Sequence, residues 1–115
     1  MTLAVAASDG ELAARSIAGD QQAFAEIVSR HKQFLYGLTA RLVGNPDDAL
    51  DLVQEAFVSA HAALKRYDRD RPMRTWLARI AINKARDWRR KERVRAVLRS
   101  VLPLGDAPDV AADQV

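Results

Sequence analysis

The sequence predicts an all-α protein, built as a compact bundle of three to four main helices, and three observations support this fold class. Apolar residues recur every three or four positions in each strongly periodic segment, and no segment alternates like a strand over more than a few residues. Glycine, asparagine and proline fall between these segments, where helices end and begin. With 115 residues, the chain is long enough for one modest core.

The N-terminal part of the chain predicts two helices. Ser8 or Asp9 can cap a short first helix, which Gly19 would end. Asp20 then opens a long second helix, and Gly44 stops it because glycine readily adopts the left-handed conformation just past a helix end. Three-and-four spacing predicts the buried face of this long helix, which consists of Phe24, Ile27, Val28, Phe34, Leu35, Leu38, Leu42 and Val43.

A third helix is predicted over 46–64. Asn45 can cap it, Pro46 suits its first position, and the two aspartates that follow favour the positive end of the helix dipole. Its predicted buried stripe consists of Leu50, Val53, Phe57, Ala60 and Leu64.

The last helix is predicted to start at Pro72 and to run to about Leu98. Its packing side is predicted to consist of Met73, Leu77, Ile80, Ala81 and Trp88. Prolines, a glycine and scattered aspartates beyond it are typical of a linker or tail. We therefore expect a helical domain over 1–98 and a linker or tail over 99–115.

Charge is concentrated in the last part of this domain. Residues 65–95 hold 13 Lys or Arg against four Asp or Glu, a net charge of +9, whereas the whole chain carries only +3. The helix over 46–64 has four acidic residues and no Lys or Arg. A basic amphipathic helix with tryptophans usually binds polyanions. Two adjacent helices of opposite charge therefore indicate two different partners.

One sector of the basic helix combines the groups that nucleic-acid binding needs. Within about 100° of the helix surface fall Thr75, Trp76, Arg79, Asn83, Arg86 and Arg90. Arginines can meet phosphates, an amide can bond a base edge and an indole can stack on a base. The residues alone leave alternatives open, because charge runs are usually solvated faces. For Trp76, packing and stacking are equally compatible with its position, and a base-reading role for Asn83 is undecided.

Several classes of site are excluded or unexpected. The absence of cysteine excludes disulfides, thiolate nucleophiles and cysteine-ligated zinc. His31 and His61 are isolated, so we expect structural or surface roles and no metal site. No nucleophile–base set or phosphate loop is present, and we expect neither an enzyme nor a cofactor. Without a membrane-length apolar run or a signal peptide, a cytoplasmic protein is expected.

An ordered set of motifs resembles one protein family. The string DDALDLVQEAF over 47–57, Tyr67-Asp68, and PMRTWLARIAIN over 72–83 are similar to the second conserved region (region 2) of bacterial sigma factors, especially the extracytoplasmic-function group. The resemblance covers about residues 10–95. It implies a region 2 helical domain of a transcription initiation factor, which binds RNA polymerase core and recognises and melts the promoter minus-ten element.

The resemblance also implies roles for particular residues. The acidic helix would dock on the clamp helices of the polymerase largest subunit through Asp48, Asp51, Leu52, Gln54 and Glu55. The loop Tyr67–Arg71 would form a pocket for a flipped base, Asn83 would read a base, and Trp76 with nearby arginines would support strand opening. The full set expected on the non-template strand is Tyr67, Asp68, Arg69, Asp70, Arg71, Arg74, Thr75, Trp76, Arg79, Asn83, Arg86 and Arg90.

Three features depart from the family pattern. His61 stands where many members have tryptophan, and Met73 where phenylalanine is frequent. Full-length members also carry a second, helix-turn-helix domain (region 4) that reads the minus-thirty-five element. We expect that domain to be absent here and the chain to be an expressed fragment rather than a natural truncation. The resemblance further implies a dedicated anti-sigma factor as a partner.

Two other functions are compatible with the residues. One is a regulator that places the basic helix in the major groove of duplex DNA, although the short second helix and tight glycine turn of a helix-turn-helix are not evident. The other is a helical interaction module whose basic face meets an acidic partner protein.

Overall fold

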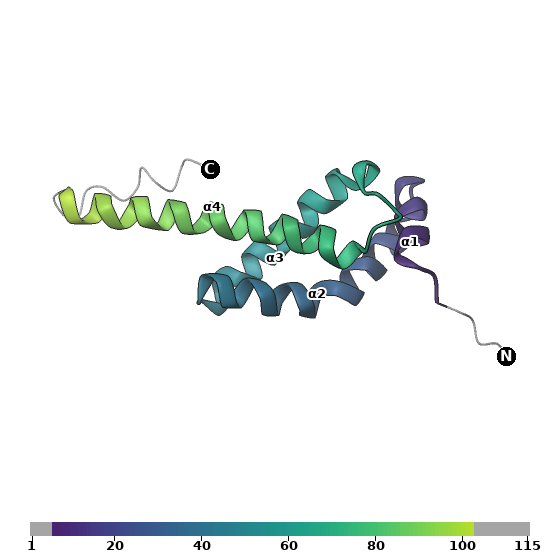
Figure 1. The fold of residues 1–115 in the computed structure, drawn as a ribbon, viewed down its shortest axis with the longest axis horizontal. Coiled ribbons are helices and arrows are strands. Elements are labelled where there is room, and N and C mark those ends of the chain that lie inside the picture. The colour runs from purple at the N-terminus through teal and green to yellow at the C-terminus, as the bar shows by residue number, and fades with distance from the viewer. Residues whose placement is uncertain (1–5, 103–115) are drawn as a thin grey trace. The chain divides into compact units, whose positions relative to one another are not determined.

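Four α-helices and one short 3-10 helix make up residues 6–102, the part of the chain that the computed structural model describes. They are α1 (Asp9–Ile17), α2 (Gln21–Val43), α3 (Pro46–Ala62), η1 (Leu64–Arg66) and α4 (Met73–Val101) (Figure 1). No strand occurs in this part of the chain, and the predicted all-α fold class is confirmed. The chain divides into two units, one ending at Ala85 and the other beginning at Arg86.

Side-chain caps fix the ends of the first two helices. Ser8 Oγ accepts from the Glu11 amide at 3.0 Å, and the Glu11 carboxylate accepts from the Ser8 amide at 2.9 Å, which completes a capping box. Asp20 accepts from two amides in the first turn of α2. Gly44, with a φ of 74°, ends α2 in the left-handed conformation that side chains disfavour. The predicted boundaries of these helices are confirmed.

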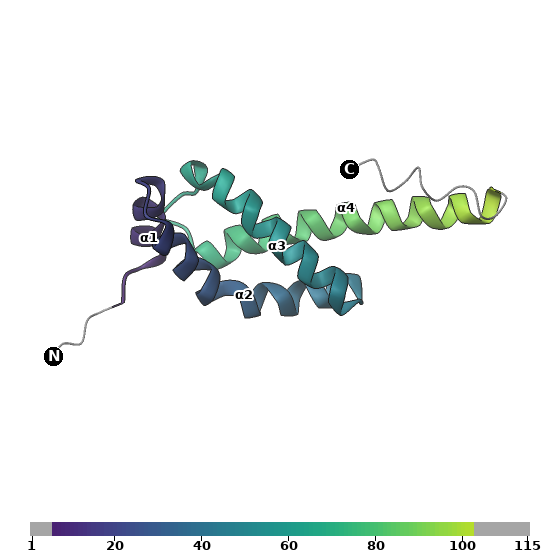
Figure 2. The same cartoon turned by 180° about the vertical axis from the view of Figure 1, so that it is seen from behind.

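A tight connection brings α2 and α3 together. The Asn45 side chain accepts from the amides of Asp47 at 2.9 Å and Asp48 at 3.1 Å, and Pro46 occupies the first position of α3, as predicted. Only Gly44 and Asn45 separate the two helices, which pack against each other (Figure 2). The acidic residues of α3 therefore begin directly after this cap.

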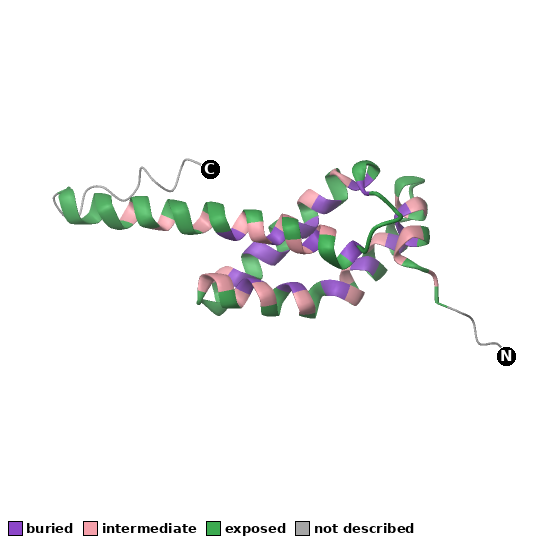
Figure 3. Cartoon of the chain, viewed as in Figure 1, coloured by how far each residue is buried: buried purple, intermediate pink, exposed green. Residues whose placement is uncertain are grey.

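The first unit contains the core, to which every helix contributes (Figure 3). Phe24 of α2 meets Phe57 of α3 edge to face, with ring centroids 6.5 Å apart. The core residues are Leu12 and Ala13 of α1, Ala23, Ile27 and Leu35 of α2, Val53, Ala56, Phe57 and Ala60 of α3, Leu64, Tyr67, and Met73, Leu77 and Ala81 of α4.

A carboxylate of α1 also ties that helix to α2. Asp9 Oδ1 accepts from Arg30 Nη1 at 3.3 Å, and Asp9 Oδ2 lies 3.0 Å from His31 Nε2. His31 is 7% exposed, so its role is structural, one of the two roles expected for it. The other ring nitrogen of His31 is buried without a hydrogen-bond partner among the described residues.

The predicted buried stripe of α3 was partly wrong. Leu50 is 50% exposed, whereas the other four predicted residues are buried, namely Val53, Phe57, Ala60 and Leu64. Ala49, Leu52 and Ala56 are buried as well and were not predicted. The sequence pattern favoured the bulky leucine. Alanine occupies the interior instead, because small side chains allow packed helices to approach closely.

The buried face of α2 is narrower than its apolar residues indicate. Its fully buried line steps by four residues and consists of Ala23, Ile27, His31, Leu35 and Thr39. Of the eight residues predicted for this face, only Ile27 and Leu35 are buried, and the others are half-buried. A line of one residue per turn is what a helix presents to the centre of a bundle, while its flanking apolar residues cover the edges.

Helix boundaries differ slightly from prediction in the second half of the chain. α3 ends at Ala62, where η1 follows, and α4 runs from Met73 to Val101 rather than to Leu98. The predicted packing residue Trp88 is half-buried, belongs to the second unit and is not part of the core. The proline- and glycine-containing segment predicted as a tail lies outside the described residues from 103 onward.

Candidate nucleic-acid interface

Internal hydrogen bonds hold the loop between η1 and α4 in shape. The Tyr67 hydroxyl donates to the Arg71 carbonyl at 2.6 Å, which closes the loop across its base. Asp68 Oδ1 accepts from the Asp70 amide at 2.9 Å, and the Arg71 amide donates to the Asp68 carbonyl at 2.9 Å. The side chains of Asp68, Arg69, Asp70 and Arg71 are exposed. The loop therefore presents these four polar side chains from a preformed turn.

Tyr67 fixes the loop to the core rather than projecting from it. It is only 8% exposed, and its ring lies 5.0 Å from that of Trp76, centroid to centroid. Burial raises the pKa of the Tyr67 phenol above its usual 10.0, and the nearby carboxylates of Asp9 and Asp68 raise it further. The neutral hydroxyl is thereby favoured as the donor to Arg71.

Trp76 combines packing with partial exposure. Its indole is half-buried, rests on Tyr67 and packs against the core. The packing role left open by the sequence is thus present.

The first turns of α4 expose a line of polar side chains on the face away from the core. Thr75, Arg79 and Asn83 are four residues apart and exposed, so they follow one another along the same side of the helix. The Arg74 guanidinium lies 4.2 Å from the centroid of the Phe34 ring, a cation–π contact that holds this arginine against α2. Thr75, Arg79 and Asn83 therefore share one exposed side of α4, whereas Arg74 is directed toward α2.

The second unit carries a cluster of arginines on α4. The predicted Arg86 and Arg90 are exposed, and with Arg89 and Arg93 they line a hollow of about 350 Å³. Arg90 pairs with Asp87 at 3.0 Å, an exposed ion pair of the kind that contributes little to stability. Arg89 and Arg93 were not singled out from the sequence. Their spacing of three to four residues from the predicted arginines could have identified them.

The acidic face of α3 also differs in detail from the expectation. Asp51, Gln54 and Glu55 are exposed and Asp48 is half-buried, but Leu52 is only 6% exposed and lies beneath this face. Two apolar side chains missed by the sequence prediction share the exposed side of α3, namely Leu50 (50% exposed) and Val58 (70% exposed). The face is therefore acidic with apolar flanks.

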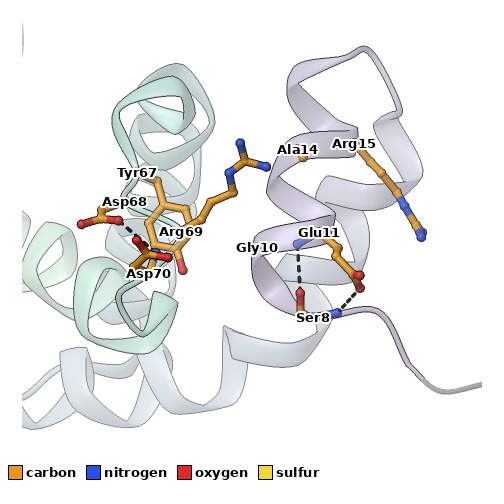
Figure 4. A pocket seen from close by; sticks show the side chains of 9 residues that line it. All are labelled: Ser8, Gly10, Glu11, Ala14, Arg15, Tyr67, Asp68, Arg69 and Asp70. Carbon is orange, nitrogen blue, oxygen red and sulfur yellow. Dashed lines mark hydrogen bonds between the residues drawn. The ribbon is translucent and has the colours of Figure 1, made fainter.

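A hollow of about 810 Å³ separates α1 from the loop (Figure 4). The predicted loop residues Tyr67, Asp68, Arg69 and Asp70 line one side. The other side belongs to α1 and consists of Ser8, Gly10, Glu11, Ala14 and Arg15. No sequence signal could identify these α1 residues, because a fold contact brings together segments more than 50 positions apart in the chain.

Two other kinds of site are absent from residues 6–102. No group of three or more His, Cys, Asp or Glu side chains there is placed to hold a metal ion. Helices of the length and apolarity that a membrane crossing requires are likewise absent from this part of the chain.

Comparison with known proteins identifies the family. The family model described as Sigma-70 region 2 matches residues 27–95. The RNA polymerase sigma factor CnrH of Cupriavidus metallidurans is 45% identical over 111 residues, which are 93% of this chain and 58% of that protein. The chain spans about half the length of the curated relatives it matches.

Two solved structures share the fold. One is the NMR structure of an engineered region 2 of sigmaE in complex with GTAAAA, with a TM-score of 0.71 and 35% identity over 88% of this chain and 100% of that one. The other is CnrH in complex with the cytosolic domain of CnrY, with a TM-score of 0.63 and 38% identity over 84% of this chain and 68% of that one. The chain therefore belongs to the sigma-70 family, as a region 2 domain related to extracytoplasmic-function sigma factors.

Proposed function

We propose that this chain is the promoter-recognising domain of a transcription initiation factor, which binds RNA polymerase and holds the opened non-template strand of the minus-ten element. One observation carries this proposal: the engineered region 2 of sigmaE, which this chain covers in full at 35% identity, is bound to GTAAAA. The thymine identifies that sequence as DNA. It is short enough to be held as a single strand. The preformed loop and the exposed line on α4 are the surfaces that would bind it.

The proposed division of labour follows from side-chain chemistry. Arg79 and Arg86 are cations that would meet phosphates, which gives affinity but reads no sequence. Asn83 is an exposed amide that can donate to and accept from a base edge, so it is the proposed base reader on the helix. The loop would hold a flipped base, and its contacts would offset the few kcal/mol that flipping costs.

The acidic face of α3 is the proposed polymerase contact. Asp51, Gln54 and Glu55 are exposed on a helix that is anchored in the core along its length. A core-backed surface keeps its geometry on binding and suits a specific protein partner. The proposed docking site is the clamp-helix region of the largest polymerase subunit.

Regulation by an anti-sigma factor is part of the proposal. CnrH, which is 38% identical in its solved structure, is found in complex with the cytosolic domain of CnrY. A comparable partner would bind this chain and compete with polymerase or promoter. The domain would act in the cytoplasm as a non-catalytic initiation factor, without a cofactor.

The test compares the GTAAAA strand with its complementary strand and with the duplex that the two form. The chain is titrated with single-stranded GTAAAA, with its complementary strand and with the duplex, and binding is followed by fluorescence anisotropy at two salt concentrations. We expect the tightest binding to the GTAAAA strand and weaker binding to the duplex. Equal affinity for all three would overturn strand-specific recognition and favour a general polyanion-binding face. Co-purification with core polymerase tests the second half of the proposal.

A further inference from the structure

We infer that helix α1 forms the second wall of the base pocket and that Glu11 contacts the base held there. This inference rests on the proposed function and extends it to a helix that precedes the family match, which starts at residue 27. It adds a specificity element to the loop Tyr67–Arg71 predicted from the sequence.

The shape of the hollow supports a ligand between α1 and the loop. Its volume of about 810 Å³ falls within the range of small-ligand pockets. Gly10 and Ala14 give α1 a low surface on this side, and the Arg69 side chain reaches across the hollow toward that surface (Figure 4). A Cβ at Gly10 would lie 3.5 Å from Arg69 Cβ, so the two segments meet at the edge of the hollow.

Both walls are held in place by contacts within the protein. The loop is closed by the bond from Tyr67 to the Arg71 carbonyl. α1 is fixed by burial of Leu12 and Ala13 and by the pairing of Asp9 with α2. A ligand would therefore enter a preformed site, which lowers the ordering cost of binding.

The charges of the lining favour a base over a phosphate. Three carboxylates (Glu11, Asp68 and Asp70) and two guanidinium groups (Arg15 and Arg69) line the hollow. Asp68 is engaged by the Asp70 amide and by Arg71, which leaves Glu11 and Asp70 as the carboxylates without an ion pair among the described residues. Ionised carboxylates only accept hydrogen bonds, and they select bases that offer an exocyclic amino group. Thymine offers carbonyl oxygens on both sides of its pairing edge and is the base that the site would disfavour.

In Figure 4 the Glu11 carboxylate is turned toward Ser8 and away from the loop, so its contact with a base requires a change of its side-chain torsions. Its Oε1 accepts from the Ser8 amide, which leaves the second carboxylate oxygen without a partner among the described residues. Glutamine also serves at this position of a capping box. Glu11→Gln therefore removes the charge while the helix start is retained.

The decisive variant fills the hollow without changing charge. Ala14→Leu places a larger side chain on the α1 wall, and leucine is a strong helix former. Ala25→Leu makes the same substitution on an exposed position of α2, away from the hollow, and serves as the matched control. Circular dichroism and melting temperature establish that each variant is folded.

The probes are single-stranded GTAAAA and two sets of variants. In one set each position in turn is abasic, and in the other each base that is not thymine is replaced in turn by thymine. For the wild-type chain, removal of the pocketed base weakens binding by about tenfold, the lower part of the range for one stacked base. Ala14→Leu is expected to weaken binding of the intact strand by a similar factor and to leave the abasic strand unchanged, whereas Ala25→Leu stays within about twofold. Glu11→Gln should reduce the penalty for thymine at that position alone.

The outcomes separate the two proposals. If the wild-type chain prefers the single strand but Ala14→Leu and Glu11→Gln bind every probe as wild type does, the α1 wall is wrong and the proposed function stands. If the wild-type chain shows no preference for the single strand over the duplex, the proposed function falls and this inference falls with it.

Discussion

Helices α3 and α4 both expose charge, but only α3 rests on buried side chains along its whole length. The six buried residues of α3 extend from Ala49 to Ala60, whereas the four of α4 end at Ala85. Residues 86–101 of α4 bury no side chain. A surface backed by a core has a fixed shape, while an exposed run of arginines acts mainly through charge. The difference separates shape-specific binding from electrostatic binding within one small chain.

The largest expected effect tests the two halves of α4 with the same substitution. Leu77 is fully buried and Leu98 is 43% exposed. Leu77→Ala should lower the free energy of unfolding by about 2–5 kcal/mol because it leaves a cavity. Leu98→Ala should change it by less than about 0.5 kcal/mol. Urea denaturation followed by circular dichroism measures both, and equal losses would show that the second half of α4 is also packed.

The second prediction compares a base reader with a phosphate contact. Asn83→Ala should cost about 1–3 kcal/mol of discrimination at one base of the single strand. Arg86→Ala should weaken binding to every sequence alike and lower the salt-dependence slope by about 0.7. A panel of single-base variants, titrated at several salt concentrations, distinguishes the two. Uniform weakening by Asn83→Ala would assign the asparagine to the backbone of the strand.

The third prediction concerns the acidic face of α3. Asp51→Arg should weaken binding to core polymerase by about tenfold, because it reverses a charge on a fixed, complementary surface. Binding to the isolated strand should be unchanged. Gln33→Arg introduces the same side chain at an exposed position of α2 and is the control. Surface plasmon resonance measures polymerase binding. Equally strong binding by both variants would show that α3 is not the docking element.

The smallest effect lies in the loop at the start of α4, where the chain is still anchored to the core. The Tyr67 pKa is raised in the folded chain, so the unfolded chain ionises first as pH rises past 10.0. The stability that the neutral phenol contributes is fully present below that pH and declines as pH rises toward the folded pKa.

Tyr67→Phe loses the hydrogen bond to Arg71, and at neutral pH it should be less stable by about 1 kcal/mol. The gap between wild type and Tyr67→Phe should narrow above pH 10.0 in urea titrations. Tyr36→Phe removes a phenol at a position that is 37% exposed and is the matched control. A gap that is constant with pH would mean that the phenol ionises equally in both states.

Local chemistry predicted the helix boundaries well. Ser8, Asp20 and Asn45 each satisfy amides of the turn that follows, so their positions follow from short-range hydrogen bonding. Spacing predicted that Leu77 is buried. It misplaced Leu50, because the choice between a leucine and the adjacent Ala49 depends on how closely α3 approaches its neighbours. That approach is a property of the packed bundle and is not encoded in either residue.

The candidate site was predicted only where it is local in sequence. The loop residues and the line through Thr75 and Asn83 lie in one stretch, and the structure exposes them; their contact with a DNA strand stays a prediction. The opposite wall of the hollow comes from α1, which no motif connects with the loop. Leu52 was expected to contact polymerase but is buried. Residues of one motif can therefore serve packing and binding on different sides of a helix.

Helix α1 has nine residues, which is too short for a stable helix in isolation. Its structure therefore depends on docking through Leu12, Ala13 and Asp9. Such a segment opens at lower free energy than the rest of the bundle, and its amide hydrogens should exchange with solvent sooner than those of α2. A nucleotide bound between α1 and the loop would slow that exchange, so hydrogen-exchange rates in α1 provide a direct measure of pocket occupancy.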